Sequence, residues 1–217
     1  MLHIACLHTA DSNVQVFDTA LQELGTEGVR LRHGVRADLL AAAEQAGGLT
    51  PEIAEQTAGV LRDLCDGADA VLLTCSTLGP AADAAAAAAS VPMIRVDAMF
   101  AREAVRGGGK VAVLCAVQTT VEPTRLLFEK EARATGAEVV MHLVPGVWDV
   151  FKAGDRSRYL SMIAMAADEA FQGGATQVVL AQASMTGAAK LGTGGRVPLT
   201  SPMVGLSAAI EAAAVRL

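Results

Sequence analysis

Short apolar runs alternate with longer amphipathic or alanine-rich stretches along most of the chain. The runs Leu2–Leu7, Val71–Thr74, Lys110–Cys115 and Gln177–Leu180 have the length of buried strands. Each is followed by a polar segment and then by a stretch long enough to form a helix. This alternation predicts strand–helix units, and hence parallel sheets that are covered by helices on both faces.

Weaker patterns complete the prediction. Four further runs are expected to form strands: Val29–Arg32, Val91–Val96, Glu138–Leu143 and Val197–Thr200. Helices are expected at about residues 14–24, 37–46, 51–66, 80–89, 98–106, 122–135, 155–172, 184–191 and 202–217. The start at residue 51 is the best marked, because Thr50 can cap the helix and Pro51 suits its first position.

The second half of the chain repeats the first at an offset of about 107 residues. His3–Leu7 aligns with Lys110–Leu114, and Val71–Leu73 aligns with Val178–Leu180. Internal similarity of this kind predicts two similar Rossmann-like lobes related by pseudo-twofold symmetry, each a parallel sheet flanked by helices. We expect residues 1–97 with 203–217 to form the first α/β lobe, and residues 98–202 to form the second.

Polar residues follow the first and third strands of both halves. They are His8–Asn13, Cys75–Thr77, Gln118–Thr120 and Gln182–Met185. Ligands of open α/β sheets bind outside the carboxyl ends of the strands, so these four segments are the predicted ligand-binding loops, converging on a cleft between the lobes. The preference of strand ends for short polar residues in turns is the alternative explanation.

Cys75 is the predicted reactive centre. It lies between a buried strand and an alanine-rich helix, among the polar residues Thr74, Ser76 and Thr77. The N-terminal end of a helix carries partial positive charge, so a thiol placed there is expected to favour its thiolate form. Cys6, Cys65 and Cys115 lie in or beside apolar runs and are expected to be small buried hydrophobic residues.

Composition narrows the function classes. The chain has 217 residues, a formal net charge of −6 and 52% apolar residues, which favours a globular cytoplasmic protein over one that binds nucleic acid. No apolar run is long enough to span a membrane, and the N-terminus lacks the basic region of a signal peptide. The sequence contains no C-x-x-C pair, which would indicate a disulfide or metal site, and no G-x-G-x-x-G after the first strand. Neither a metal nor a cofactor is therefore expected.

Several features match one known family: the internal repeat, Thr74–Thr77, Thr119–Thr120, and Val197–Pro202 leading into Gly205–Leu206. In these features the chain resembles the aspartate/glutamate racemase superfamily. That group includes aspartate, glutamate and hydantoin racemases, arylmalonate decarboxylases and maleate isomerases, and the resemblance covers essentially the whole chain. It implies cofactor-independent proton chemistry at the α-carbon of a small carboxylate or amino acid. Racemases of this group use two cysteines, one in each lobe, on opposite faces of the α-carbon.

The first of these cysteines matches Cys75, but the second is replaced. Both the repeat and the resemblance place Gln182 at its position, and glutamine has no titrating proton. Cys115, which aligns with His8, is the nearest other thiol of the second half. His8 or Asp11 are further candidates to supply the missing proton.

Three hypotheses follow from the resemblance. The protein is a single-thiol enzyme, such as a decarboxylase or a cis–trans isomerase of a small dicarboxylate; a racemase or epimerase in which another group supplies the second proton; or a catalytically silent carboxylate-binding protein. A homodimer or higher homo-oligomer is expected, because relatives commonly form dimers. The implied substrate-binding residues are Asn13, Ser76, Thr77, Thr119, Thr120, Gln182, Ala183 and Ser184.

Overall fold

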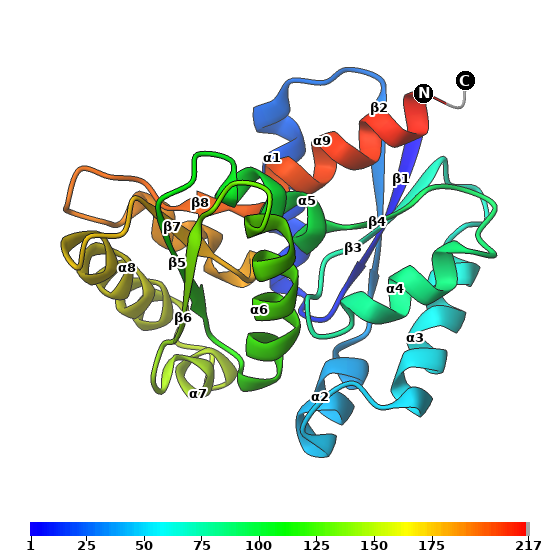
Figure 1. Ribbon diagram of the computed structural model, residues 1–217. Coiled ribbons are helices and arrows are strands. Elements are labelled where there is room, and N and C mark those ends of the chain that lie inside the picture. Colours follow the sequence, from blue (N-terminus) through cyan, green and yellow to red (C-terminus); the bar gives the residue numbers. More distant parts are fainter. Residues whose placement is uncertain (216–217) are drawn as a thin grey trace. The chain divides into compact units, whose positions relative to one another are not determined.

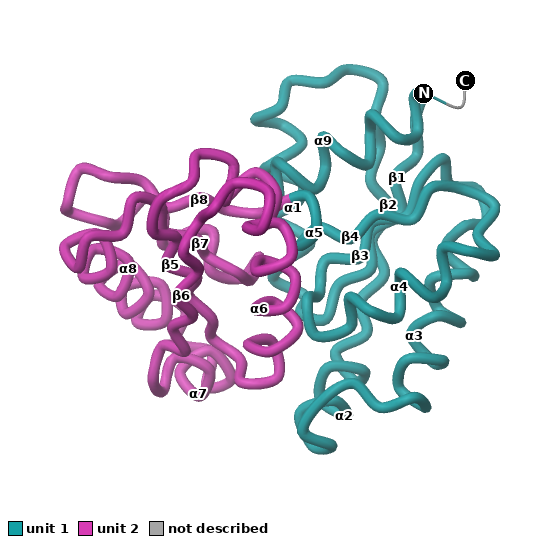
Figure 2. Tube along the Cα trace, viewed as in Figure 1, with its two compact units in different colours: residues 1–99, 202–217 teal, residues 100–201 magenta. Residues whose placement is uncertain are grey.

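The computed structural model describes residues 1–215, which form two compact α/β units. Unit 1 comprises Met1–Met99 and the segment that begins at Pro202, whereas unit 2 comprises Phe100–Ser201 (Figure 1, Figure 2). The chain therefore passes from the first unit to the second within one helix, α5 (Val96–Val105), and returns at the start of another, α9 (Ser201–Ala214).

Unit 1 is built on a parallel four-stranded sheet of order β2-β1-β3-β4. Its strands are β1 (Leu2–His8), β2 (Val29–Val35), β3 (Ala70–Leu73) and β4 (Met93–Arg95). Its other helices are α1 (Ser12–Leu24), α2 (Ala37–Ala46), α3 (Pro51–Asp63) and α4 (Gly79–Ala86).

Unit 2 is built on a second parallel sheet of order β6-β5-β7-β8. Its strands are β5 (Lys110–Cys115), β6 (Glu138–Leu143), β7 (Gln177–Leu180) and β8 (Leu199–Thr200). Its helices are α6 (Gln118–Ala132), α7 (Val147–Lys152), α8 (Arg156–Gln172) and the 3-10 helix η1 (Ala183–Lys190).

The two sheets confirm the internal repeat and the α/β fold class. Their strand orders are equivalent, and their central strands pair in the same register: Ile4 pairs with Ala70 in unit 1, and Val111 pairs with Gln177 in unit 2. The predicted offset therefore places Cys75 and Gln182 at equivalent turns, each directly after the third strand of its sheet.

The two central strands of the unit 1 sheet, β1 and β3, are buried on both faces. Ala5 and Leu7 of β1 point into an apolar core with residues of α2, α3 and α4. Alternate residues of a strand point to opposite faces, so Cys6 and His8 lie on the other face. There the His8 ring packs against Phe17 of α1, with 5.2 Å between the ring centroids. Figure 1 shows the strands of unit 1 between α1 and the pair α3–α4.

The core of unit 2 forms where α7, α8 and η1 pack against β5 and β7. Tyr159 is fully buried, and the ring of Phe151 lies between it and Trp148, with centroid distances of 5.0 and 4.8 Å. Burial of such large aromatic groups is a major stabilising contribution in a chain with few of them. These rings therefore belong to the packing of unit 2.

Most predicted elements are confirmed, with differences at several of their ends and one additional helix. The Thr50 side chain accepts from Ile53 N at 3.4 Å, so the predicted start of α3 is confirmed. Gln118–Thr120 was predicted as a loop, which is wrong, because these residues form the first turn of α6. Helix α7 was not predicted, and β4 and β8 are shorter than the apolar runs that indicated them.

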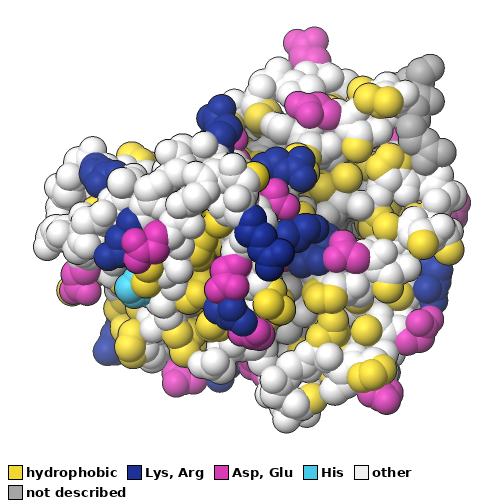
Figure 3. Space-filling view, viewed as in Figure 1, with side chains coloured by type: hydrophobic (Ala, Val, Ile, Leu, Met, Phe, Trp, Pro, Cys, Tyr) yellow, Lys and Arg dark blue, Asp and Glu magenta, His cyan; other side chains and the backbone are white. Residues whose placement is uncertain are grey.

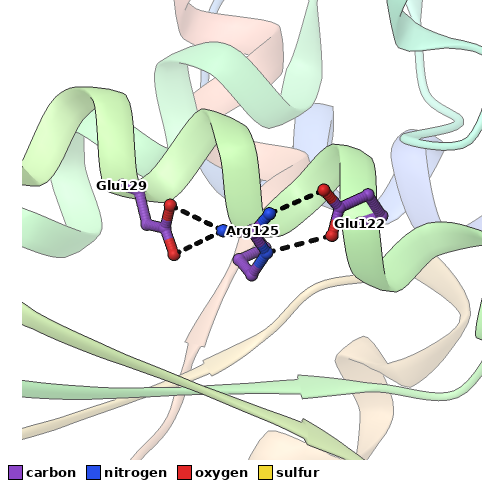
Figure 4. A network of polar contacts seen from close by, with 3 residues as sticks. All are labelled: Glu122, Arg125 and Glu129. Atoms are coloured by element: carbon purple, nitrogen blue, oxygen red, sulfur yellow. Dashed lines mark hydrogen bonds and ion pairs between the residues drawn. The ribbon is translucent and has the colours of Figure 1, made fainter.

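Charged side chains of both signs are interspersed on the face shown in Figure 3. One group of them lies along α6, where Arg125 bonds to Glu122 and Glu129, one turn before and one turn after it (Figure 4). Pairs at this spacing support an exposed helix modestly. Among the described residues, no helix is long and apolar enough to cross a membrane.

Candidate functional site

The turn that carries Cys75 connects the end of β3 to the start of α4 in unit 1. Thr74 N donates to Leu7 O at 3.0 Å, which extends the β1–β3 ladder by one residue, and Gly79 N donates to Ser76 O at 3.1 Å. Ser76 and Thr77 are buried, while Cys75 is partly exposed. The backbone thus turns sharply, with the thiol at the carboxyl edge of the sheet.

Opposing effects act on the Cys75 thiol. Burial is the largest and raises its pKa, and the charge of Asp97 raises it further. Hydrogen bonds from the Thr9 side chain and from the backbone N–H groups of Leu78 and Thr77 lower it by stabilising the thiolate. The net pKa is raised, so the expectation that the helix N-terminus leaves a readily ionised thiolate is wrong. Desolvation outweighs the donors.

Arg95 forms ion pairs with two carboxylates close to this turn. Its guanidinium bonds to both carboxylate oxygens of the buried Asp97, at 3.1 and 2.9 Å, and also to Asp83 on α4. A Cβ atom at Gly79 would overlap this guanidinium. The absence of a side chain at position 79 therefore lets α4 begin directly against the Arg95–Asp97 pair.

The segment after β1 places Asn13 in the first turn of α1, where its side chain is buried and its Oδ1 has no hydrogen-bond partner among the described residues. Asp11 is exposed. His8 is fully buried, its ring nitrogens lie 2.8 Å from Thr74 Oγ1 and 2.8 Å from His33 Nδ1, and burial lowers its pKa to about 3. A ring so difficult to protonate is a poor source of the second proton.

In unit 2, the turn after β7 contains Gln182, Ala183 and Ser184, the last two buried at the start of η1. Gln182 Oε1 accepts from Ala116 N at 2.7 Å, which orients the side-chain amide. Its Nε2 is buried and has no acceptor at normal hydrogen-bond geometry among the described residues. An oriented amide, whose donor nitrogen is buried near the Cys115 thiol, therefore occupies the position equivalent to the Cys75 thiol.

Cys115 is unsuited to replace the missing thiol. It is fully buried at the end of β5, and burial raises its pKa to about 12. Gln182 also lies near enough to lower this pKa, but that effect is smaller. An inaccessible thiol that remains protonated over the physiological range is neither an efficient base nor an accessible acid.

Two residues of the second turn's surroundings were missed by sequence reasoning. Tyr159 Oη lies 2.8 Å from Ser184 Oγ, and Arg156 Nη2 donates to Ser184 O at 3.3 Å. Arg156 Nη1 is buried without a partner among the described residues. The signal was present: Arg156 is the first residue of α8, an end of the helix where a cation is unfavourable without another role.

The contacts group the predicted residues by unit. Cys75 lies with Thr9 and Thr77, whereas Gln182 lies with Ala116, and Ser184 lies with Tyr159 and Arg156. Thr119 and Thr120 stand on the first turn of α6. A hollow of about 440 Å³ in unit 2 lies elsewhere, lined by Gly107–Gly109 and Thr176 among others.

Similar solved structures share this architecture. Aspartate racemase from Picrophilus torridus superposes with a TM-score of 0.76 at 13% identity, covering 99% of this chain and 95% of that one. An aspartate racemase homologue from Pyrococcus horikoshii gives 0.65 at 17% identity, covering 99% and 100%. Allantoin racemase from Klebsiella pneumoniae gives 0.66 at 17% identity, covering 100% and 89%. At such identities these likenesses show the fold alone.

Sequence comparison shows the family more directly. No curated protein matches the chain significantly, but the family model described as Asp/Glu/hydantoin racemase matches residues 8–209. The match begins at the last residue of β1, covers the other strands of both sheets and includes the Cys75 and Gln182 turns. This chain belongs to the Asp/Glu/hydantoin racemase family.

Proposed function

We propose that this protein is a racemase-type enzyme that performs cofactor-independent proton transfer at the α-carbon of a small carboxylate or amino acid, with Cys75 as its only acid–base thiol. The observation that carries this proposal is the surroundings of Cys75: one hydroxyl and two backbone N–H groups bond to a partly exposed thiol at the carboxyl edge of a parallel sheet. These donors stabilise a negative charge on the sulfur.

In the proposed reaction, the Cys75 thiolate removes the α-proton and becomes a thiol, while the electron pair of the C–H bond passes to the carbon as an enolate-like anion. Return of the proton from the same sulfur regenerates the thiolate and the starting enantiomer, so inversion requires that the anion instead takes a proton from water on its other face. The raised pKa makes the thiolate scarcer but more basic, which suits it to a weakly acidic C–H bond. Ser76 and Thr77 are proposed to bind the substrate carboxylate and stabilise the developing charge.

The turn in unit 2 supports substrate binding and no proton transfer. The Gln182 amide is held by Ala116 N and offers a buried donor, but it cannot ionise. With Asn13, Thr119, Thr120, Ala183 and Ser184, it is proposed to bind the substrate. A single acid–base thiol returns the proton to the face from which it came, so exchange of the α-proton should exceed inversion.

The surroundings of Arg156 favour a substrate that carries a carboxylate group. One of its terminal nitrogens is occupied by Ser184 O, while the other is buried with no partner among the described residues. An unpaired guanidinium N–H is costly to bury unless a ligand bonds to it, and a carboxylate is its best-matched partner.

The test is α-proton exchange in D₂O, followed by proton NMR and mass spectrometry. The enzyme is incubated with both enantiomers of aspartate and glutamate, with small dicarboxylates and with 5-substituted hydantoins. We expect deuterium incorporation into at least one of these, and its loss in Cys75→Ser. Cys65→Ser is the matched control, because Cys65 is a partly buried thiol of the same unit, bonded to Leu61 O. Exchange that persists in Cys75→Ser would contradict the proposal.

A further inference from the structure

Three metal-binding side chains lie on one face of the unit 1 sheet. Cys6 and His33 are direct partners in the parallel pairing of β1 and β2, and His8 is two residues beyond Cys6. Such positions point their side chains to the same face of a sheet. One ligand atom from each residue lies within 4.8 Å of the other two. Cys6 and His8 are fully buried, while the His33 side chain is 15% exposed.

Hydrogen bonds fix the outer nitrogen of each imidazole. Thr74 Oγ1 donates its only proton to Leu7 O at 3.0 Å, so it accepts from His8 Nδ1 at 2.8 Å. On the other ring, His33 Nε2 lies 3.1 Å from Asp18 Oδ1 and donates to that carboxylate. Both outer nitrogens therefore carry their protons.

The inner nitrogens face each other. With Nδ1 protonated, the neutral His8 ring has its lone pair on Nε2, which lies 2.8 Å from His33 Nδ1. A single proton between them satisfies this contact in the metal-free protein. The same two nitrogens, together with the Cys6 sulfur, form a convergent set of one soft and two borderline donors, which suits Zn²⁺.

The surroundings are those of a ligating histidine pair. Histidines that bind metals donate their other ring N–H to a carboxylate, carbonyl or similar acceptor, which fixes the tautomer and the ring orientation. Asp18 does this for His33, and Thr74 does it for His8. Two rings whose inner nitrogens are independently held facing each other, with one thiol within 4.8 Å of both, are more than a chance grouping of polar side chains.

We propose that Cys6 Sγ, His8 Nε2 and His33 Nδ1 bind one Zn²⁺ ion, with a fourth position open to water. Zn²⁺ takes the place of the proton between the imidazoles and of the Cys6 thiol proton, so both are released to solvent. Tetrahedral zinc places two nitrogens roughly 3.4 Å apart, so the rings separate by about half an ångström. His33 can make this movement, because it is partly exposed and β2 is an edge strand.

No sequence motif marks this site, because its ligands come from two strands and His8 and His33 are 25 residues apart. Only the register of β1 and β2 brings them together. The ion would join these strands and, through Asp18 and Thr74, connect to α1 and to the residue before Cys75.

The test uses protein stripped with a chelator, with Zn²⁺ for stoichiometry and Co²⁺ as the spectroscopic probe. We expect one Zn²⁺ per chain, a zinc-dependent rise in the melting temperature, and a thiolate-to-Co²⁺ charge-transfer band. Cys6→Ser should abolish the band and weaken Zn²⁺ binding at least tenfold, and His33→Asn should weaken binding similarly. Cys65→Ser and Cys75→Ser should retain both signals, since neither thiol belongs to the cluster.

X-ray absorption at the zinc edge of the wild-type protein provides a test that does not depend on the folding of any variant. We expect one sulfur and two imidazole nitrogens around the ion. Absence of stoichiometric binding, a zinc shell without sulfur, or a charge-transfer band that survives Cys6→Ser and disappears in Cys75→Ser would each overturn the proposal.

Discussion

The turns after β3 and β7 have the same backbone position but different chemistry. Thr74 N donates to Leu7 O at 3.0 Å in unit 1, and Ala181 N donates to Leu114 O at 3.0 Å in unit 2. The next residue is Cys75 in the first turn and Gln182 in the second. The fold therefore preserves two equivalent turns, while an ionisable group is present in only one of them.

The residues at the strand ends beside the two turns are also more polar in unit 1 than in unit 2. In unit 1, His8 and Thr74 are hydrogen-bonded, and Thr9 bonds to Cys75 through its side chain. The equivalent positions of unit 2 are Cys115, Ala181 and Ala116. There the Gln182 side chain accepts from the backbone N–H of Ala116 and lies beside the Cys115 thiol. Polar side chains surround the thiol, whereas the amide is held by the backbone. This contrast supports the proposal that unit 1 carries out the proton transfer.

Removing the thiol should have the largest effect. We expect Cys75→Ala to lower the rate of α-proton exchange by a factor of about 10² to 10⁴, the range of a general base. Measurement is by NMR in D₂O with saturating substrate. An equally large loss in Gln182→Ala without a change in KM would break the contrast between the turns.

The pH dependence should report the raised pKa of Cys75. The thiolate is the active form, so kcat/KM for exchange should rise about tenfold per pH unit while the pH is below that pKa. Since burial raises the pKa above the ordinary thiol value of 9.0, the rise should continue past pH 9. Exchange by Cys75→Ala at each pH corrects for solvent catalysis. A plateau below pH 8 would contradict the assignment.

Giving unit 2 a thiol should reduce the contrast. We expect Gln182→Cys to raise the rate of inversion relative to exchange by about tenfold or more, because a second acid becomes available. The ratio is measured by chiral chromatography and NMR on the same samples. Gln182→Ser is the control, since its hydroxyl does not ionise in this range, and it should leave the ratio unchanged.

Arg156 should affect binding more than chemistry. We expect Arg156→Met, which keeps much of the apolar stem, to raise KM about tenfold with kcat changed less than twofold, because one charge-assisted hydrogen bond is lost. Arg158→Met is the matched control, since Arg158 is exposed on the same helix. A fall in kcat at unchanged KM would show that Arg156 acts in the transition state instead.

Gly79→Ala should have the smallest effect, on stability. A methyl group there overlaps the Arg95 guanidinium, so we expect the free energy of unfolding to fall by about 1–3 kcal/mol. Gly59→Ala is the control: Gly59 lies within α3, its added Cβ would approach Arg62 no closer than 3.9 Å, and alanine should stabilise this helix by up to about 1 kcal/mol. Urea unfolding measures both. Equal stabilisation by the two substitutions would contradict the role of Gly79.

Periodicity predicts the repeated strands and their helices because their apolar runs are long and regular. It fails for α7, where Val147–Lys152 is too short to show a clear helical period, and for Gln118–Thr120, whose polar residues resemble a loop but begin a helix. The offset of 107 residues placed Cys75 and Gln182 at equivalent turns without coordinates.

The direction of the Cys75 pKa shift could not be predicted from the sequence, because it results from competing long-range effects. The helix end and the N–H donors at Cys75 are local and suggest a lowered pKa, but desolvation depends on residues from several elements and reverses the outcome. The environment of His8 could not be predicted either, because its hydrogen-bond partners Thr74 and His33 are distant in sequence. Arg156, in contrast, could have been identified from the sequence, because a basic residue is unfavourable at the first position of a helix.

The most direct test of one-sided proton transfer compares exchange and inversion in one reaction. A single enantiomer of an exchanging substrate is incubated in D₂O, and deuterium content and enantiomeric excess are followed from the earliest turnovers. We expect deuterium to accumulate at least about tenfold faster than the opposite enantiomer, and both processes to stop in Cys75→Ser. Inversion as fast as exchange in the wild-type protein would contradict one-sided proton transfer.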